Sequence, residues 1–211
     1  MSVKTTKSEQ THSGSPEHDF TVGVLRGGSS REREVSLETG QAVVNALESR
    51  PCRVLEYDTS VDLGERLESD DVDVVFVALH GKGGEDGSVQ ALLEWRNIDY
   101  TGPGPQASAL CMDKVRTRQV FDTVDVPSPD WFRIRPGDPV ENQGDFDRMV
   151  VKPRYEGSSL GMSIVGEEDL EDAVAGAREF DEDVLVEEYV DGYELTVGAF
   201  VRDSLEILPP V

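Results

Sequence analysis

VDVVFVALHGKGGEDG, residues Val72–Gly87, is the most informative stretch of the chain for its fold. It begins with almost continuous apolar and β-branched residues, as in a strand that is buried on both faces of a sheet. Four glycines follow within the seven residues 81–87, so a flexible loop is expected at the carboxyl end of this strand, the edge where α/β sheets bind ligands. Ser88 then has the side chain of a helix N-cap, and a helix is expected through Trp95.

The residues before this stretch have the same strand–loop–helix order. Phe20–Leu25 is an apolar run that ends at a glycine pair, and from Val35 onward apolar residues recur on one helical face. Arg53–Tyr57 is a further candidate strand. Alternating strands and helices predict a parallel α/β sheet over residues 20–105.

The pattern changes after the turn-forming residues Gly102–Pro105. A helix is expected over Asp113–Val124 and a polar connector over residues 136–147. Short loops between the later elements favour an antiparallel α+β unit, with strands at 149–153, 162–165, 184–190, 193–201 and 205–208 and a helix at 167–178. These patterns predict a disordered tail (1–19), a first domain (20–105) and a second domain (106–211).

The charge of the chain excludes several classes of function. The formal net charge is −23 and the pI is near 4.3, which would repel nucleic-acid backbones and anionic membrane surfaces. Only Cys52 and Cys111 are present, so a reducing cytoplasmic location is expected. The 20 basic residues include only five lysines, and so acidic a surface with so little lysine favours a salt-loving host.

Two loops of the first half are candidates for binding a small charged molecule. Glu32 follows the first glycine pair near the start of a helix, where the helix dipole keeps a carboxylate ionised and able to hold a substrate ammonium. His80, in the second glycine loop, could orient a carboxylate or an amine. A solvated charge run and a histidine beside a flexible loop are the alternative interpretations.

The second half carries candidates for binding a nucleotide. Lys114 near a helix start and Lys152 at a strand end could each reach a phosphate, and the small-residue loop at Gly157–Ser159 supplies backbone and hydroxyl donors. This loop lacks the Walker A spacing. Glu187 and Glu188 could border an adenine slot, with Glu194 at the ribose; the alternatives are a solvated helix face, an empty hairpin loop and a strand with a charged end.

Taken together, the order and spacing of these motifs resemble the D-alanine–D-alanine ligase family of ATP-grasp enzymes. The resemblance implies an α/β fold, with an N-terminal Rossmann-like parallel-sheet domain followed by an incomplete α+β ATP-grasp domain. It also implies an enzyme that uses ATP and Mg²⁺ to join two D-alanines through an acyl phosphate. The matching stretches are Gly27–Leu37, Ala78–Gly87, Tyr100–Lys114, Val151–Gly161 and Val186–Val197.

The resemblance also implies roles for individual residues. Glu32 would hold the ammonium of the first substrate, His80 would help to position that substrate, and Ser158 would join Glu32 in a catalytic hydrogen-bonded group. The nucleotide would be bound by Lys114, Lys152, Gly157, Ser158, Ser159, Glu187, Glu188, Val190 and Glu194.

The chain also departs from the family pattern. We expect the ligands for Mg²⁺, a transition-state arginine and a tyrosine partner of Ser158 to lie beyond Val211, so that this polypeptide alone has little or no activity. Three alternatives remain: a ligase for other amino acids, a split enzyme with a second chain, and a non-catalytic nucleotide- or amino-acid-binding module. Expected partners are ATP and D-alanine or another small amino acid, with a possible homodimer.

Overall fold

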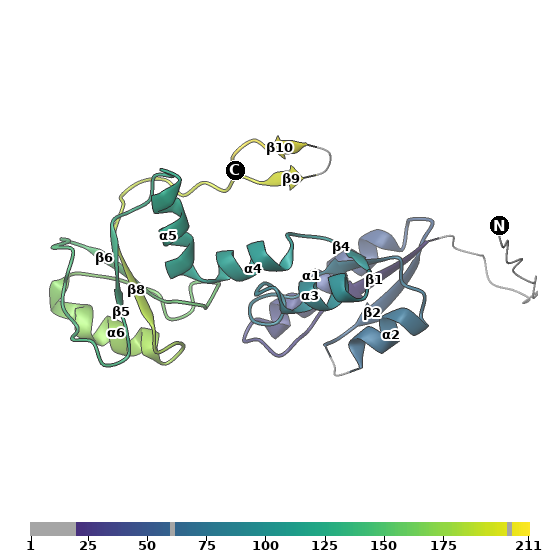
Figure 1. The fold of residues 1–211 in the computed structure, drawn as a ribbon, viewed down its shortest axis with the longest axis horizontal. Helices are drawn as coiled ribbons and strands as arrows, with labels where there is room; N and C mark the ends of the chain where they lie inside the picture. Colours follow the sequence, from purple (N-terminus) through teal and green to yellow (C-terminus); the bar gives the residue numbers. More distant parts are fainter. Residues whose placement is uncertain (1–19, 60–61, 202–203) are drawn as a thin grey trace, which may run out of the picture. The chain divides into compact units, whose positions relative to one another are not determined.

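The computed structural model describes residues 20–59, 62–201 and 204–211, and it divides the chain into two units (Figure 1). The first unit ends at Cys111 and the second begins at Met112. The tail predicted over residues 1–19 lies outside the described residues.

The first unit is built on a parallel sheet with the strand order β2-β1-β3-β4. Val22 of β1 lies beside Val54 of β2 and beside Val74 of β3. The predicted parallel α/β sheet is confirmed. Because β1 and β3 are parallel neighbours, the loops at their carboxyl ends meet at one edge of the sheet. The strands are β1 (Thr21–Leu25), β2 (Arg53–Tyr57), β3 (Val74–Val77) and β4 (Asp99–Tyr100).

Helices pack against this sheet and close its core. Leu25 and Val75 of the strands are completely buried and share a core cluster with Leu67 of α2 and Leu93 of α3. The helices of this unit are α1 (Arg33–Leu47), α2 (Leu63–Ser69), α3 (Ser88–Trp95) and α4 (Pro105–Met112).

The boundary between the units lies at the end of α4 rather than at the turn before it. Pro105 is the first residue of α4, a position that suits proline because the first N–H groups of a helix have no partner within it. A Cβ atom on Gly87 would lie 2.5 Å from the Pro105 carbonyl oxygen. The first turn of α4 therefore lies directly against the glycine loop of the first unit.

The second unit contains an antiparallel sheet with the order β5-β8-β6-β7, as the short loops predicted. Val151 of β6 and Val186 of β8 are completely buried and pack with Val174 and Ala177 of α6. The elements are α5 (Lys114–Thr123), β5 (Trp131–Ile134), β6 (Met149–Pro153), β7 (Ser163–Val165), a 3₁₀ turn η1 (Glu167–Asp169), α6 (Leu170–Arg178) and β8 (Val184–Glu188).

The connector at residues 136–147 has no helix or strand, as predicted, yet it contributes to the core. Val140 and Phe146 pack against the core of the second unit, and the rings of Phe146 and Phe132 lie 5.9 Å apart between centroids. The connector is therefore fixed to the sheet by its apolar side chains.

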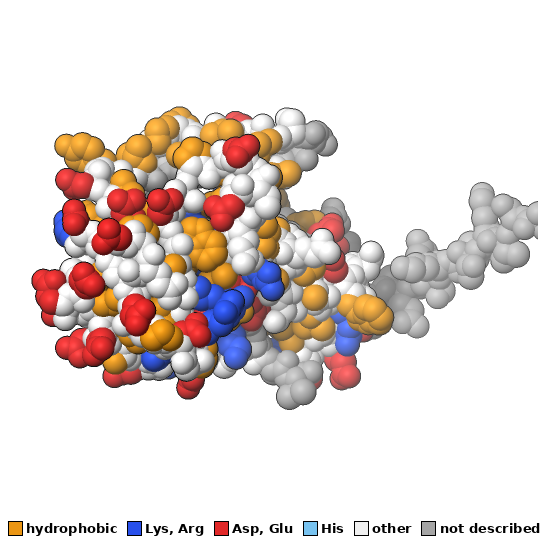
Figure 2. Space-filling model, turned by 60° about the vertical axis from the view of Figure 1, so that its left-hand side comes forward, with side chains coloured by type: hydrophobic (Ala, Val, Ile, Leu, Met, Phe, Trp, Pro, Cys, Tyr) orange, Lys and Arg blue, Asp and Glu red, His pale blue; other side chains and the backbone are white. Residues whose placement is uncertain are grey.

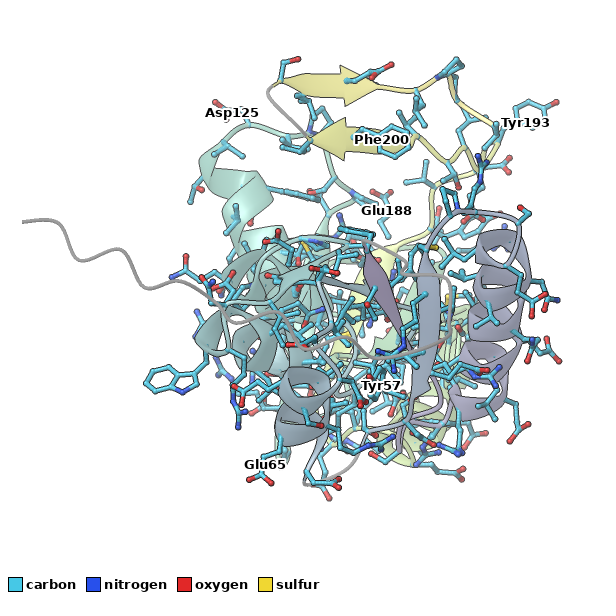
Figure 3. All side chains as sticks on the ribbon, turned by 90° about the vertical axis from the view of Figure 1, so that its right-hand side faces the viewer. Tyr57, Glu65, Asp125, Glu188, Tyr193 and Phe200 are labelled. Atoms are coloured by element: carbon cyan, nitrogen blue, oxygen red, sulfur yellow. The ribbon has the colours of Figure 1, made fainter. Side chains whose placement is uncertain are left out.

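A hairpin of β9 (Ala199–Val201) and β10 (Leu205–Ile207) follows β8. Its pairing extends further, since the backbone groups of Thr196 and Val211 exchange hydrogen bonds of 2.9 and 3.0 Å. The strand expected at 193–201 is nevertheless too long, because β9 begins only at Ala199. Tyr193 is 99% exposed and points away from the hairpin (Figure 3).

One predicted cap is wrong. The N-cap of α3 is Gly87, with φ of +90°, and not Ser88, which is the first helical residue. The Asp86 carboxylate accepts the Ser88 N–H at 3.0 Å and the Gly83 N–H at 2.9 Å. Asp86 thus holds the loop and the helix start together, and the glycine supplies the left-handed backbone that the turn requires.

Carboxylates are spread over the face shown in Figure 2, with Lys and Arg side chains gathered in a smaller group near its centre. Across residues 20–59, 62–201 and 204–211, no helix combines the length and apolar character that crossing a membrane requires.

Candidate active site

Glu32 lies at the start of α1, as predicted, and faces the second glycine loop. It is the N-cap residue of α1, and only 8% of its surface is exposed. A Cβ atom on Gly81 would lie 2.6 Å from Glu32 Oε2. The carboxylate is therefore packed against the backbone of the loop that follows β3.

Serine hydroxyls hold these two loops together. Ser30 Oγ donates to the His80 carbonyl oxygen at 2.8 Å and accepts the Glu32 N–H at 3.2 Å. Ser36 Oγ, completely buried, donates to the Ala78 carbonyl oxygen at 2.8 Å and accepts the Gly27 N–H at 2.9 Å. The position of Glu32 relative to His80 is thus set by side chains within the predicted motif.

The His80 ring is held through both nitrogens. Nε2 lies 3.1 Å from Thr39 Oγ1 of α1, and Nδ1 lies 3.5 Å from Glu85 Oε1. The other oxygen of Glu85 accepts the Gly81 N–H at 2.8 Å. Thr39 and Glu85 were not among the predicted site residues. The available signal was the position of Thr39, seven residues after Glu32 and therefore on the same face of the helix.

A methyl group at Gly81 is expected to disturb this cluster. Gly81→Ala places a Cβ against Glu32 and also strains the backbone, since Gly81 has a φ of +64°. Gly83→Ala strains the backbone in a similar way, but the added Cβ would have no atom within 4 Å. We expect Gly83→Ala to lower the free energy of unfolding by about 1 kcal/mol and Gly81→Ala by about 2–3 kcal/mol. Chemical unfolding of both variants measures the difference; equal losses would show that Glu32 does not pack here.

In the second unit, Glu187 of β8 joins two cations. Its side chain is only 3% exposed, and its oxygens pair with Arg118 Nε of α5 and Lys152 Nζ of β6. Burial alone would raise the pKa of Glu187, but the hydrogen bonds from Arg118 and Lys152 outweigh it and hold the pKa below its ordinary value. Glu187 is therefore an ionised carboxylate between two cations.

Lys114 lies near this pair, at the start of α5. Its Nζ donates to the carbonyl oxygens of Arg154, at 3.3 Å, and Glu156. Burial and the neighbouring charge of Lys152 lower the pKa of Lys114. Two ammonium groups held this close form a site that favours an anion.

The loop after β6 has a backbone suited to binding anions. Ser158 and Ser159 have φ of +48° and +57°. These values lie in the left-handed region, which residues other than glycine seldom adopt. The turn is closed by the Leu160 N–H donating to the Gly157 carbonyl at 3.0 Å and the Met162 N–H donating to the Ser159 carbonyl at 3.2 Å. Concave turns of this kind present N–H groups to phosphate oxygens.

A buried ionic network supports this loop. The Arg154 guanidinium, 9% exposed as a residue, donates to both oxygens of Asp113 and, at 2.8 Å, to Asp183 Oδ2. Asp113 is also the N-cap of α5 and accepts the Arg116 N–H at 3.1 Å. The network joins the start of α5, which carries Lys114, to the end of β6, which carries Lys152.

The remaining predicted residues lie further along the chain. Glu188 is exposed, and its N–H donates to the Asp130 carbonyl oxygen at 2.9 Å. Val190 and Glu194 are exposed on the irregular segment between β8 and β9. The structure thus brings Glu187 together with the lysines and leaves Val190 and Glu194 on a surface segment.

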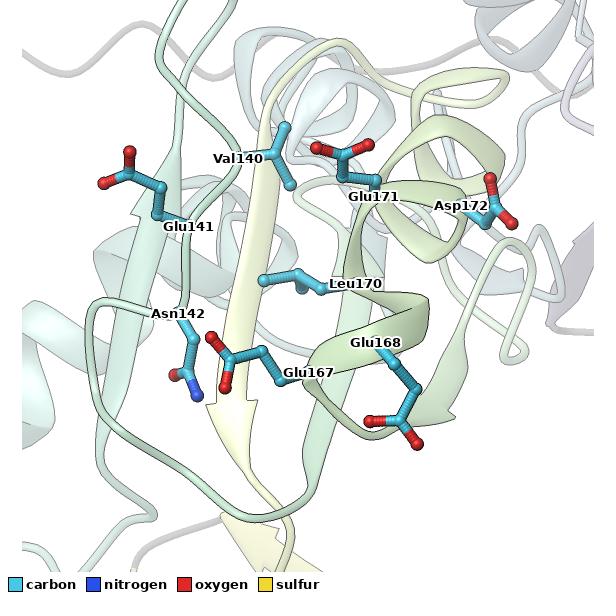
Figure 4. A pocket seen from close by; sticks show the side chains of 8 residues that line it. All are labelled: Val140, Glu141, Asn142, Glu167, Glu168, Leu170, Glu171 and Asp172. Carbon is cyan, nitrogen blue, oxygen red and sulfur yellow. The ribbon is translucent and has the colours of Figure 1, made fainter.

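A cavity of about 480 Å³ elsewhere in the second unit shares no residue with these clusters (Figure 4). Its carboxylates would repel phosphate groups. It is lined by Val140, Glu141, Asn142, Glu167, Glu168, Leu170, Glu171 and Asp172.

Comparison with known proteins identifies the family of both units. Residues 55–103 match the family model for the D-Ala–D-Ala ligase N-terminus, and residues 120–211 match the model for the C-terminus of the same family. The chain belongs to the D-alanine–D-alanine ligase family. The first match ends before the boundary between the two units and the second begins after it.

Individual relatives of the family support the same assignment. A D-alanine–D-alanine ligase of Pseudomonas fluorescens is 45% identical over 193 residues, which cover 90% of this chain and 59% of that protein. One of Pelotomaculum thermopropionicum is 39% identical over 199 residues, covering 89% of this chain and 63% of that protein. The chain therefore spans about three fifths of the length of the curated relatives it matches.

Solved structures of the family confirm the α/β architecture with its ATP-grasp unit. The D-alanine–D-alanine ligase of Bacillus anthracis superposes with a TM-score of 0.78 at 31% identity, covering 90% of this chain and 63% of that one. The same enzyme complexed with ATP gives a TM-score of 0.76 at 29% identity, covering 90% of this chain and 65% of that one.

Proposed function

We propose that this chain carries the ATP-binding residues and the first-substrate site of an ATP-dependent ligase that joins two D-alanines. The observation that supports this most strongly is the group formed by Lys114, Lys152 and the 157–159 loop, in the unit that matches the ligase C-terminal model. The Glu32–His80 cluster supplies the complementary site for a small amino acid.

In the proposed reaction, a carboxylate oxygen of the first D-alanine attacks the γ-phosphorus of ATP and ADP leaves. The amine of the second D-alanine then attacks the acyl carbon, loses a proton, and inorganic phosphate leaves. Lys114 and Lys152 would offset phosphate charge, while Glu32 would hold the ammonium of the first D-alanine and His80 would orient that substrate. Ser158 would contribute its hydroxyl to the hydrogen bonds around Glu32.

The nucleotide base would lie beside Glu187, with the backbone from Glu188 to Val190 at its edge and Glu194 at the ribose. Mg²⁺ is the metal that such a reaction uses. Within the part of the chain that the structure describes, no group of three His, Cys, Asp or Glu side chains is arranged to hold a metal ion. The described residues therefore do not form that site.

The proposed setting is the cytoplasm, where the dipeptide would enter peptidoglycan synthesis, with the protein a possible homodimer. Cys52 and Cys111 are both free thiols in the structure, which is compatible with a reducing compartment.

Glu32→Gln tests the substrate site. Loss of the carboxylate charge is expected to weaken binding of D-alanine by about 30-fold or more, because a charge-assisted hydrogen bond to the ammonium is removed. Glu34→Gln removes the same charge from an exposed residue of the same helix turn and serves as the control. Titration of D-alanine in the presence of ATP measures both; equal affinity of the two variants would contradict the proposal.

The composition supports the further proposal of a salt-loving host. If repulsion within a chain of net charge −23 limits its stability, screening should raise the melting temperature by about 5 °C or more between about 0.1 M and about 2 M KCl. Thermal melts followed by circular dichroism measure this. A melting temperature that stays constant or falls would count against the halophilic origin.

A further inference from the structure

Arg118 occupies a position that the proposed nucleotide contacts leave unexplained. Its Nε donates to Glu187 Oε1, the oxygen that Lys152 does not use. Its guanidinium also lies 5.9 Å from the centroid of the Phe121 ring on the same helix. Arg118 is thus held against Glu187 from the side of α5.

The spacing on α5 places two cations on one face. Lys114 and Arg118 are one helical turn apart, so both side chains project in the same direction. Lys114 contacts carbonyl oxygens of the loop after β6, while Arg118 contacts Glu187 on β8. Helix α5 therefore supplies one cation to the loop and another to the buried carboxylate.

The charges show why a second cation matters. Glu187 is almost completely buried, and a buried carboxylate without a partner is strongly unfavourable. If Lys152 were its only partner, moving the ammonium toward a phosphate would leave Glu187 uncompensated. With Arg118 in place, the carboxylate keeps one cation while Lys152 changes partner.

We propose that Arg118 is a positioning residue, which holds Glu187 so that the Lys152 ammonium can pass from that carboxylate to an incoming polyphosphate. This inference rests on the proposed function, in which Lys152 binds nucleotide phosphate. Arg118 itself would contact Glu187 and not the phosphate.

The test is calorimetric titration of the 211-residue chain with ATP and with inorganic tripolyphosphate, which has no base to contact Glu187. Arg118→Leu is expected to weaken tripolyphosphate binding about tenfold, because Lys152 becomes the sole partner of Glu187. Removing the carboxylate as well, in Arg118→Leu/Glu187→Gln, should restore the affinity to within about threefold of wild type. Glu187→Gln alone should bind at least as tightly as wild type.

Arg116→Leu is the matched control. It removes the same charge from the same helix, at an exposed residue. The Arg116 guanidinium donates a hydrogen bond of 2.9 Å to Gln119 Oε1, one turn along the same helix. Its tripolyphosphate affinity should stay within about twofold of wild type. Melting curves of every variant identify any loss of folding. If Arg118→Leu does not fold, Glu187→Gln decides alone: tripolyphosphate binding weaker than that of the wild type would overturn the inference.

The outcomes separate the two proposals. A wild-type chain that binds neither ATP nor tripolyphosphate overturns both. If the wild-type chain binds both ligands, two results overturn the role of Arg118 and leave the nucleotide site intact. One is a tripolyphosphate affinity of Arg118→Leu equal to that of the wild type; the other is a double variant that binds tripolyphosphate as weakly as Arg118→Leu.

Discussion

Arg154→Leu is expected to lower the free energy of unfolding of the second unit by about 3–5 kcal/mol, the usual cost of leaving a buried charge without its partner. Arg154 is the shared cation of Asp113 and Asp183, whose side chains are only 11% and 12% exposed. Leucine fills part of the volume but leaves Asp113 without its cation, while Asp183 keeps its ion pair with Arg133. Chemical unfolding followed by tryptophan fluorescence measures the loss.

The same variant should change how stability depends on pH. Burial would raise the pKa of Asp113 and of Asp183, but hydrogen bonds outweigh it and hold both pKa values below their ordinary range; Arg154 donates to Asp113, and Arg133 and Arg154 donate to Asp183. A lowered pKa stabilises the fold above the unfolded value of about 3.9 and loses that effect as the pH falls through the folded value. The deficit of Arg154→Leu should therefore be largest near neutral pH and shrink below about pH 4.

Arg135→Leu is the control, because Arg135 is an exposed residue of the same unit. Its expected effect is within about 0.5 kcal/mol. A similar small effect for Arg154→Leu, or a deficit that does not depend on pH, would show that the network does not stabilise the unit.

Lys152→Met is expected to weaken ATP binding by about 100-fold, because it removes a partly buried ammonium placed for the phosphates. The cost in stability should be small, since Arg118 remains paired with Glu187. Methionine keeps most of the apolar side chain and removes the ammonium group, with its charge and its hydrogen-bond donors. Calorimetric titration with ATP measures the affinity, and a melting curve measures the stability.

Lys82→Met makes the same chemical change at an exposed residue of the glycine loop in the first unit, and its ATP affinity should stay within about twofold of wild type. If Lys152→Met bound ATP as tightly as Lys82→Met, Lys152 would not be a phosphate ligand.

Elements defined by local pattern could be predicted from the sequence. The apolar density around Val75 predicted β3, and the helix predicted at 167–178 is present as the 3₁₀ turn η1 followed by α6. α2 and β5 were not predicted. α2 has only seven residues, of which four are charged or polar, so its periodicity is weak. β5 is a strand because Trp131–Ile134 pairs with β8, which lies about fifty residues later in the chain.

The residues of the candidate site likewise divide into those that a local motif predicted and those that depend on contacts between distant parts of the sequence. Glu32, His80, Lys114 and Lys152 were visible because each stands in a glycine- or charge-rich motif. Arg118 was not, because its partner Glu187 is 69 residues away. The Asp113–Arg154 pair is separated by 41 residues, so its ionic network emerges only when the chain is folded.

The proposed reaction joins two D-alanines with the conversion of ATP to ADP and phosphate. The most direct measurement is made on the native protein purified from its own cells, with its intact mass compared with the 23.2 kDa of these 211 residues to define the species assayed. Incubated with ATP and D-alanine, it should form D-alanyl-D-alanine with one ADP and one phosphate released per dipeptide. ATP consumption that does not depend on D-alanine, or a dipeptide made only from another amino acid, would contradict the account.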